Sequence, residues 1–88
     1  MAQATKSFKI GEYAVGGIIR VEIKGKVILI KALDYNTKEV VKQGTTTTEQ
    51  QGVESQITEF LEDLTSYYYA EKIMDWIKNK VDLKPTWY

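Results

Sequence analysis

The sequence contains neither cysteine nor histidine and has a single proline among its 88 residues. Without cysteine no disulfide can form, and without either residue type there is no thiolate or imidazole to bind a metal ion or to serve as a catalytic nucleophile or base. Three acids, Glu59, Glu62 and Asp63, cluster in a helical segment. With no other ligand type beside them, their pattern is typical of a solvated helix surface. We therefore expect no metal, no cofactor and no enzymatic activity.

Long apolar runs are also missing. No stretch approaches the roughly 20 apolar residues that cross a bilayer as a helix, and Met1–Lys6 lacks the apolar core of a signal peptide. A chain without cysteine suits a reducing compartment. We therefore expect a protein that does not enter a membrane and that works in the cytoplasm, or in the host cytoplasm if a phage or virus encodes it.

Charge is balanced in total but not along the chain. Twelve lysine and arginine residues are matched by twelve aspartate and glutamate residues, so the formal net charge is zero. Eight of the twelve cations lie in residues 1–42, whereas residues 43–66 hold five acids and no cation. The first half of the chain can therefore present a locally basic surface.

The length predicts one domain over residues 1–88. A chain of this size buries only roughly 60–65% of the surface that it exposes when unfolded, so its stability should be modest. Burial between subunits would add stability, and we therefore expect a homodimer.

Residues 7–48 have the pattern of an antiparallel β-meander of three to four strands. Apolar and polar residues alternate through Ser7–Tyr13 and through Ile18–Lys24, as expected for strands with one buried face. Lys26–Leu33 is the most apolar stretch and should be the central strand, and Lys38–Gln43 should return beside it. Thr45–Thr48 is β-branched and forms either a short edge strand or a linker.

Turn residues separate these strands. Gly16–Gly17 supplies the positive φ of a turn or bulge, and Lys24–Gly25 permits a tight hairpin. In Asp34–Thr37 the aspartate can accept hydrogen bonds from its own backbone, and Asn36 tolerates the left-handed conformation that ends such a loop.

From residue 53 to residue 81 the apolar period becomes helical. Two apolar stripes follow one another, and at about 100° per residue the second is rotated by well over 90° from the first. We therefore expect a break between Leu64 and Tyr69, near Thr65–Ser66, or a second half that packs against another chain. The stripes are Ile57, Phe60, Leu61, Leu64 and Tyr68, and then Ala70, Ile73, Met74, Ile77 and Val81.

The ends of this helical region carry weaker signals. Thr48 and Gln51 match a capping box, which would start a helix nearby. Ser66 can cap a new helix after the break. Residues 82–88 should form a C-terminal tail, because Pro85 lies beyond the last helical turn.

Aromatic side chains gather in the second half of the chain. Three consecutive tyrosines at 67–69 cannot all face one core, because neighbouring helical residues are splayed by about 100°. Tyr68 falls in the first apolar stripe, so at least one of the other two rings should lie at a surface or interface, where it either contacts a partner or caps the core. Tyrosine and tryptophan suit a protein contact because each joins a rigid apolar body to a polar tip. The candidate interface residues are Tyr67, Tyr69, Trp76 and Trp87.

Cations recur along the predicted strands, with tyrosines near the strand ends. Lysine and arginine attract phosphates, and aromatic rings stack on bases, as a surface for single-stranded nucleic acid requires. Alternatively, these lysines guard the strand edges and keep a β-protein soluble. The candidate nucleic-acid-binding residues are Arg20, Lys24, Lys26, Lys31, Tyr35 and Lys42, with Tyr13 as a further stacking candidate.

Three segments resemble the single-stranded DNA-binding domain of the transcriptional coactivator positive cofactor four and its prokaryotic and phage relatives. They are Phe8–Gly11, Ile23–Ile30 and Lys42–Gly44, the last followed by an amphipathic helix. The resemblance spans residues 7–64. It implies a curved four-stranded antiparallel sheet followed by a helix, with dimerisation through helix packing.

The resemblance also implies site residues. The lysines of a Lys-Gly-Lys hairpin would touch the nucleic-acid backbone, and an aromatic after the third strand would stack on bases. Those roles fall on Lys24, Lys26 and Tyr35. The chain departs from the family at Ile23, where an aromatic is common, and at Ala32, where a basic residue is usual.

Two functions follow as hypotheses for this α+β domain. The leading one is a small non-enzymatic protein that binds single-stranded nucleic acid on a basic, aromatic-bearing sheet. The alternative is a protein-interaction module, such as a phage or viral inhibitor or an accessory subunit, acting through its aromatic helical surface.

Overall fold

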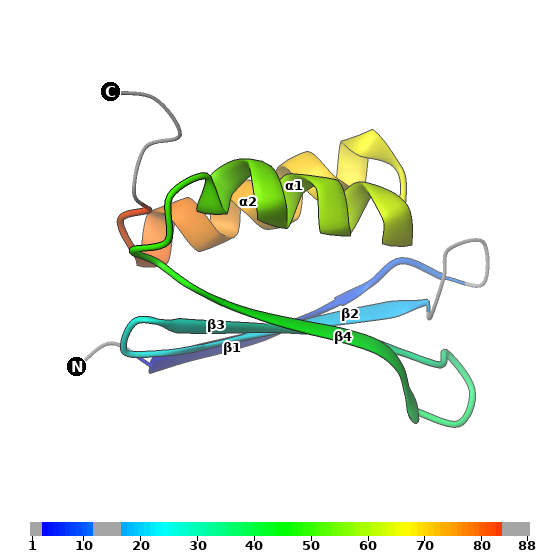
Figure 1. The fold of residues 1–88 in the computed structure, drawn as a ribbon. Helices are drawn as coiled ribbons and strands as arrows, with labels where there is room; N and C mark the ends of the chain where they lie inside the picture. Colours follow the sequence, from blue (N-terminus) through cyan, green and yellow to red (C-terminus); the bar gives the residue numbers. More distant parts are fainter. Residues whose placement is uncertain (1–2, 12–16, 84–88) are drawn as a thin grey trace.

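The computed structural model describes residues 3–11 and 17–83, and its elements follow the chain in one simple order. Four strands form an antiparallel sheet in which spatial order equals chain order, and two helices cover one face of that sheet (Figure 1). The predicted α+β fold, a β-meander followed by two helices, is confirmed. The elements are β1 (Gln3–Lys9), β2 (Ile18–Lys24), β3 (Val27–Leu33), β4 (Val40–Thr47), α1 (Val53–Leu64) and α2 (Tyr67–Lys80).

The first hairpin lies earlier in the chain than predicted. β1 ends at Lys9, so the strand predicted over Ser7–Tyr13 was placed wrongly, and Tyr13 lies outside the described residues. The N–H groups of Ile10 and Gly11 both donate to the carbonyl of Gly17, at 2.8 and 3.1 Å, and close the connection to β2. Because Gly11 has φ of 102°, the chain leaves the extended conformation there.

The β3–β4 loop is ordered by its aspartate, as predicted. The Oδ1 atom of Asp34 accepts hydrogen bonds from the N–H groups of Asn36 and Thr37, both at 2.8 Å. The left-handed residue is Lys38, with φ of 65°, rather than Asn36 as predicted. The hydrogen bonds to Asp34 hold Asn36 and Thr37 in a compact turn. The chain therefore takes its left-handed conformation at Lys38, shortly before β4 begins.

The threonine run belongs mainly to an edge strand, one of the two alternatives left open. β4 runs from Val40 to Thr47, with a bulge opposite Ala32 and Leu33. The N–H of Thr48 still donates to the carbonyl of Lys26, at 2.8 Å. Thr48 therefore adds one hydrogen bond beyond the end of β4, and because Gly52 is the N-cap of α1, the predicted capping box is wrong.

The helical region is broken where the two stripes change phase. α1 ends at Leu64 and α2 begins at Tyr67, inside the predicted interval. The residue that precedes α1 is Gly52, with φ of 78° and no capping side chain. Ser66 occupies the N-cap position of α2, but its side chain makes no capping hydrogen bond.

One hydrophobic core joins the sheet to both helices. The buried residues of both stripes pack against the same face of the sheet, in a single cluster with residues such as Ile19, Val21 and Ile30. Tyr68 is 59% exposed, so its assignment to the first stripe was wrong. The helix breaks before Tyr68, and the apolar spacing of α1 therefore does not extend to it. The second stripe is satisfied within one chain, so it supplies no surplus apolar surface for a homodimer, which stays a prediction.

Candidate nucleic-acid interface on the open face of the sheet

The face of the sheet turned away from the helices is called here the open face. Alternate residues of β2 and β3 point toward the helices and are buried, so the intervening residues point the other way. The strand register brings residues of the two strands together across this face, with Arg20 opposite Lys31 and Glu22 opposite Leu29. The open face includes Ile18, Arg20, Glu22 and Lys24 from β2, and Val27, Leu29, Lys31 and Leu33 from β3.

A single carboxylate lies among the cations of the two central strands. Glu22 is 13% exposed and has three partners: the Nζ of Lys31 at 3.2 Å, the Nε of Arg20 at 3.7 Å and the Nζ of Lys24 at 3.9 Å. One negative charge cannot neutralise three positive charges, so this group keeps a net positive charge. The shared partner also limits the freedom of Arg20 and Lys31, which lowers the entropy cost of holding an anion.

A shallow depression of about 470 Å³ crosses the open face at the end nearest the β3–β4 loop. It draws on all four strands and on the loop. Its rim is cationic, while much of its floor is aliphatic, so it can meet a ligand that has both an anionic and an apolar part. It is lined by Ser7, Lys9, Ile18, Arg20, Lys31, Leu33, Lys38 and Val40.

The β3–β4 loop places an aromatic ring and a further cation beside this depression. The Nζ of Lys38 donates to the carbonyl of Tyr35 at 2.6 Å and lies 5.2 Å from the centre of its ring. Tyr35 is 38% exposed. A Cβ on Gly17 would lie 2.7 Å from the Cβ of Tyr35, so only glycine allows the β1–β2 connection to approach the loop this closely.

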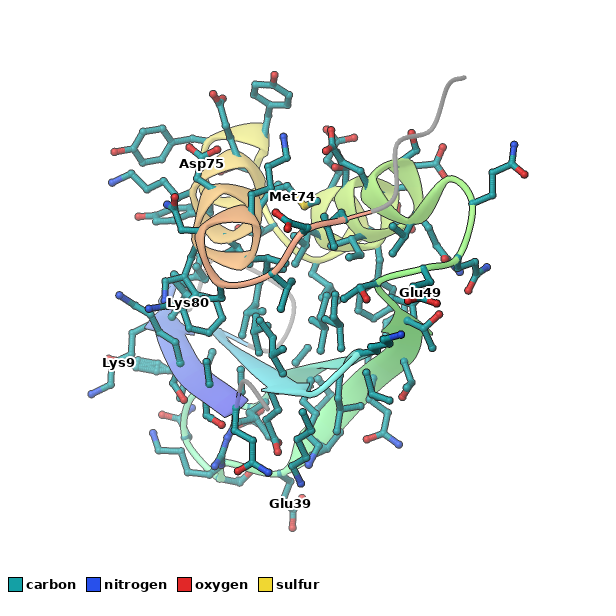
Figure 2. All side chains as sticks on the ribbon, turned by 90° about the vertical axis from the view of Figure 1, so that its left-hand side faces the viewer. Lys9, Glu39, Glu49, Met74, Asp75 and Lys80 are labelled. Carbon is teal, nitrogen blue, oxygen red and sulfur yellow. The ribbon has the colours of Figure 1, made fainter. Side chains whose placement is uncertain are left out.

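The loop also carries two carboxylates, which reduce the positive charge near the depression. Hydrogen bonds from the backbone of Thr37 and Asn36 hold the pKa of Asp34 below its ordinary value, so this group stays charged while it orders the turn. Glu39 points away from the sheet (Figure 2). Within the described residues, neither Lys9 nor Lys38 forms an ion pair with a carboxylate.

The six predicted nucleic-acid-binding residues do not share one surface. Arg20 and Lys31 line the depression, with Tyr35 in the neighbouring loop, whereas Lys24 lies toward the other end of the open face. The other two lysines lie elsewhere.

Lys26 lies in the β2–β3 turn, where its ammonium pairs with Glu49 and its carbonyl accepts from Thr48. Lys26 therefore contacts the segment that follows β4 and does not line the depression. Lys42 lies on the helix-covered face, where its Nζ is 5.5 Å from the ring centre of Phe60.

The candidate site residues chosen from the sequence leave out two cations of the depression, Lys9 and Lys38. Lys9 reaches the open face because it pairs with Ile18 across the β1–β2 hairpin. That register depends on the length of the connection, which the apolar pattern did not fix. Lys38 was identified as a strand cation, but its left-handed backbone places it in the loop.

The predicted protein-interface residues are also divided. Tyr67 is 68% exposed, whereas Tyr69 is half-buried and meets the ring of Tyr68 edge-on at 5.2 Å. Trp76 packs edge-on against Phe8, 6.1 Å between ring centres, so it belongs to the contact between α2 and β1. Trp87 lies outside the described residues.

Comparison of the chain with protein-family models, with curated proteins and with solved structures gave no match. Within residues 3–11 and 17–83, acidic side chains do not gather into a group that could hold a metal ion. Neither α1 nor α2 has the length and apolar character needed to cross a membrane.

Proposed function

We propose that this protein binds single-stranded nucleic acid on the open face of its sheet and does so without catalysis. The observation that carries the proposal is the depression, in which Lys9, Arg20, Lys31 and Lys38 surround an aliphatic floor. The exposed ring of Tyr35 lies in the loop beside it.

The charges of this surface suit a phosphodiester backbone. Each phosphate that meets a lysine or arginine releases condensed counterions, and this release supplies much of the binding free energy. Glu22 offsets only part of the charge of Arg20, Lys24 and Lys31. The open face therefore retains cations for several phosphates along an extended strand.

The apolar floor favours unpaired over paired nucleic acid. Single strands expose the faces of their bases, which stack on aromatic rings and cover aliphatic side chains, whereas a duplex hides them. Leu33 and Val40 line the floor, and Tyr35 offers a ring at its border. An open sheet face with this composition matches an extended chain of bases better than the grooves of a duplex.

A salt titration of binding to labelled oligo-dT tests the proposal, with Lys9→Ala combined with Lys38→Asn. Asparagine is chosen because it tolerates the left-handed backbone at position 38. Loss of two phosphate contacts should reduce the slope of log K against log salt concentration by about 1.4, since each contact on a single strand contributes about 0.7.

The matched control is Lys42→Ala, which removes a lysine from the same sheet but from its other face. Its affinity and salt slope should equal those of the wild type. Absence of binding to oligo-dT at low ionic strength would overturn the proposal. Equal losses in the Lys42 variant and the double variant would show non-specific attraction to lysine side chains rather than binding at this site.

A protein-interaction module is the second candidate, and the tyrosines at the start of α2 support it. Tyr67 and Tyr68 are 68% and 59% exposed, and tyrosine suits a protein contact because its apolar ring carries a polar hydroxyl. Lys72 lies over the ring of Tyr68, 4.6 Å from its centre. If oligo-dT does not bind, Tyr67→Ala with Tyr68→Ala becomes the variant that tests for loss of a protein partner.

A further inference from the structure

Charge is separated between two opposite faces of this neutral chain. The open face carries the carboxylate of Glu22 and four cationic side chains, which are Lys9, Arg20, Lys24 and Lys31. On the opposite side of the molecule, the groove between the two helices is lined by four carboxylates and one lysine, which are Glu54, Glu62, Glu71, Asp75 and Lys78. The sheet and the core lie between the two surfaces, so one face of the molecule is basic and the opposite face is acidic.

The acidic surface is a groove of about 240 Å³ between α1 and α2, called here the helix groove. Figure 2 shows Asp75 on the outer side of α2, away from the sheet. One cation lines the groove, Lys78, and it is paired with Glu54 at 3.2 Å. Three carboxylates of the groove, Glu62, Glu71 and Asp75, have no ion-pair partner within the described residues.

We propose that the open face of one chain docks on the helix groove of a second copy of the same chain, head to tail. The two surfaces are of opposite sign, and long lysine and arginine side chains can reach carboxylates that line a groove. Because the two faces differ and lie on opposite sides, the contact is heterologous. Each chain then has a basic open face for one neighbour and an acidic helix groove for another, so the assembly can keep growing at both ends.

The partner is a second copy because one chain already holds both halves of the complementary pair. Both apolar stripes of the helices are buried within the chain, so the large exposed apolar side chains of the described helices are limited to Tyr67 and Tyr68 at the start of α2. The contact is instead ionic and therefore weak and sensitive to salt, since the screening length falls from about 10 Å at 0.1 M to about 3 Å at 1 M. It does not depend on nucleic-acid binding, and it is measured with no nucleic acid present.

Complementary charge reversal tests the contact by sedimentation equilibrium at low salt. The groove variant carries Glu71→Lys and Asp75→Lys, and the sheet variant carries Lys9→Glu and Lys24→Glu. The average mass of the wild type should rise steadily with concentration and return to that of one chain at about 1 M salt. Each variant alone should stay at the mass of one chain, because its two faces then repel or no longer attract.

An equimolar mixture of the two variants should regain the growth of mass with concentration, because each reversed face meets a face of opposite sign. The control is Glu59→Lys with Asp63→Lys, which changes net charge as the groove variant does but lies outside the groove. It should assemble like the wild type. If a reversed variant is unfolded by circular dichroism, the neutral forms Glu71→Gln with Asp75→Asn and Lys9→Gln with Lys24→Gln replace it, with loss of assembly still expected in each.

Three results would overturn the proposal. They are a wild type that is monomeric at low salt, an assembly that neither variant weakens, and a mixture that stays monomeric although both variants are folded. A dimer of fixed size that ignores salt would point to an isologous apolar contact instead. Failure of oligo-dT to bind would leave these measurements unaffected.

Discussion

At the scale of single residues, the approach of Gly17 to Tyr35 fixes the border of the depression. Gly17 has φ of 77°, and a Cβ there would lie 2.7 Å from the Cβ of Tyr35. We expect Gly17→Ala to lower the free energy of unfolding by about 1–3 kcal/mol, from left-handed strain plus the clash. Urea denaturation measures the loss.

Gly11 allows the effect of left-handed backbone strain to be separated from the effect of the steric clash at Gly17. Gly11 also has positive φ, but nothing lies within 4 Å of a Cβ built on it. Gly11→Ala should therefore lower stability without moving Tyr35, whereas Gly17→Ala should shift the ring resonances of Tyr35 in NMR spectra. Equal spectra for the two variants would contradict this account of the loop.

Tyr35 should contribute to nucleic-acid affinity through stacking rather than charge. We expect Tyr35→Ala to weaken oligo-dT binding by about 1–3 kcal/mol and to leave the salt slope unchanged, because no phosphate contact is lost. Tyr35→Phe keeps the ring and should bind like the wild type. Fluorescence anisotropy over a range of salt concentrations measures both quantities, and a loss in the phenylalanine variant would mean that the hydroxyl makes the contact.

Asp34 should make the loop sensitive to acid. Hydrogen bonds from Thr37 and Asn36 lower its pKa in the folded state from the ordinary value of 3.8, so the folded chain holds the proton less tightly than the unfolded chain. This contribution to stability is fully present above the unfolded pKa and is lost as pH falls through the lower folded pKa. Asp34→Ala should therefore be less stable than the wild type near neutral pH, and the difference should shrink in strong acid. Urea midpoints at the two pH values test this, and a constant difference would contradict it.

At the scale of elements, the helix break could be predicted because the two apolar stripes point in different directions around the helix axis. Two stripes separated by well over 90° cannot both meet one sheet from a straight helix, and the chain resolves the conflict with Thr65 and Ser66. The β2–β3 hairpin was equally clear, since Gly25 supplies φ of 61° between two strongly patterned strands.

The candidate site was less predictable, because it depends on which face each strand residue takes. One residue of register moves a side chain across the sheet, and the bulge between β3 and β4 has that effect. Lys42 thus lies over Phe60, although the sequence grouped it with Arg20. Predicting that Lys9 and Lys38 line the depression would have required the register of β1 and the backbone angle of Lys38. Neither follows from local propensity.

The start of α2 leaves room for stabilisation. Ser66 makes no side-chain capping bond, and the first turn of α2 has no acidic residue. We expect Ser66→Asp to raise the free energy of unfolding by about 0.5–1 kcal/mol, through capping and the helix dipole. Ser66→Ala should change it by less than about 0.5 kcal/mol, because no bond is lost. Thermal denaturation compares the two, and a large loss in the alanine variant would show that Ser66 does cap α2 in solution.

At the scale of the whole molecule, stability should depend on one core shared by the sheet and both helices. Ile77 of α2 is fully buried in the same cluster as Ile19 and Leu61. We expect Ile77→Ala to lower the free energy of unfolding by about 2–5 kcal/mol. The exposed Asn79→Ala on the same helix should stay within about 0.5 kcal/mol of the wild type. Strands and helices should unfold together, which far-ultraviolet circular dichroism and tryptophan fluorescence can check by coincident transitions.

The order of the strands has a consequence for the time course of folding. Each strand pairs with its neighbour in the chain, so every hairpin can close over a short loop as soon as both of its strands exist. Within the described residues, the apolar side of the sheet is covered mainly by α1 and α2, with Val81 and Leu83 beside them, and all of these leave the ribosome after the four strands. A nascent chain from which residues up to Thr47 have left the ribosome can therefore have its backbone pairing nearly complete while one side of the sheet is still apolar and exposed to water. That interval is when this protein should be most prone to aggregate or to need a chaperone, and slowing the emergence of residues 48–80 from the ribosome should lengthen it.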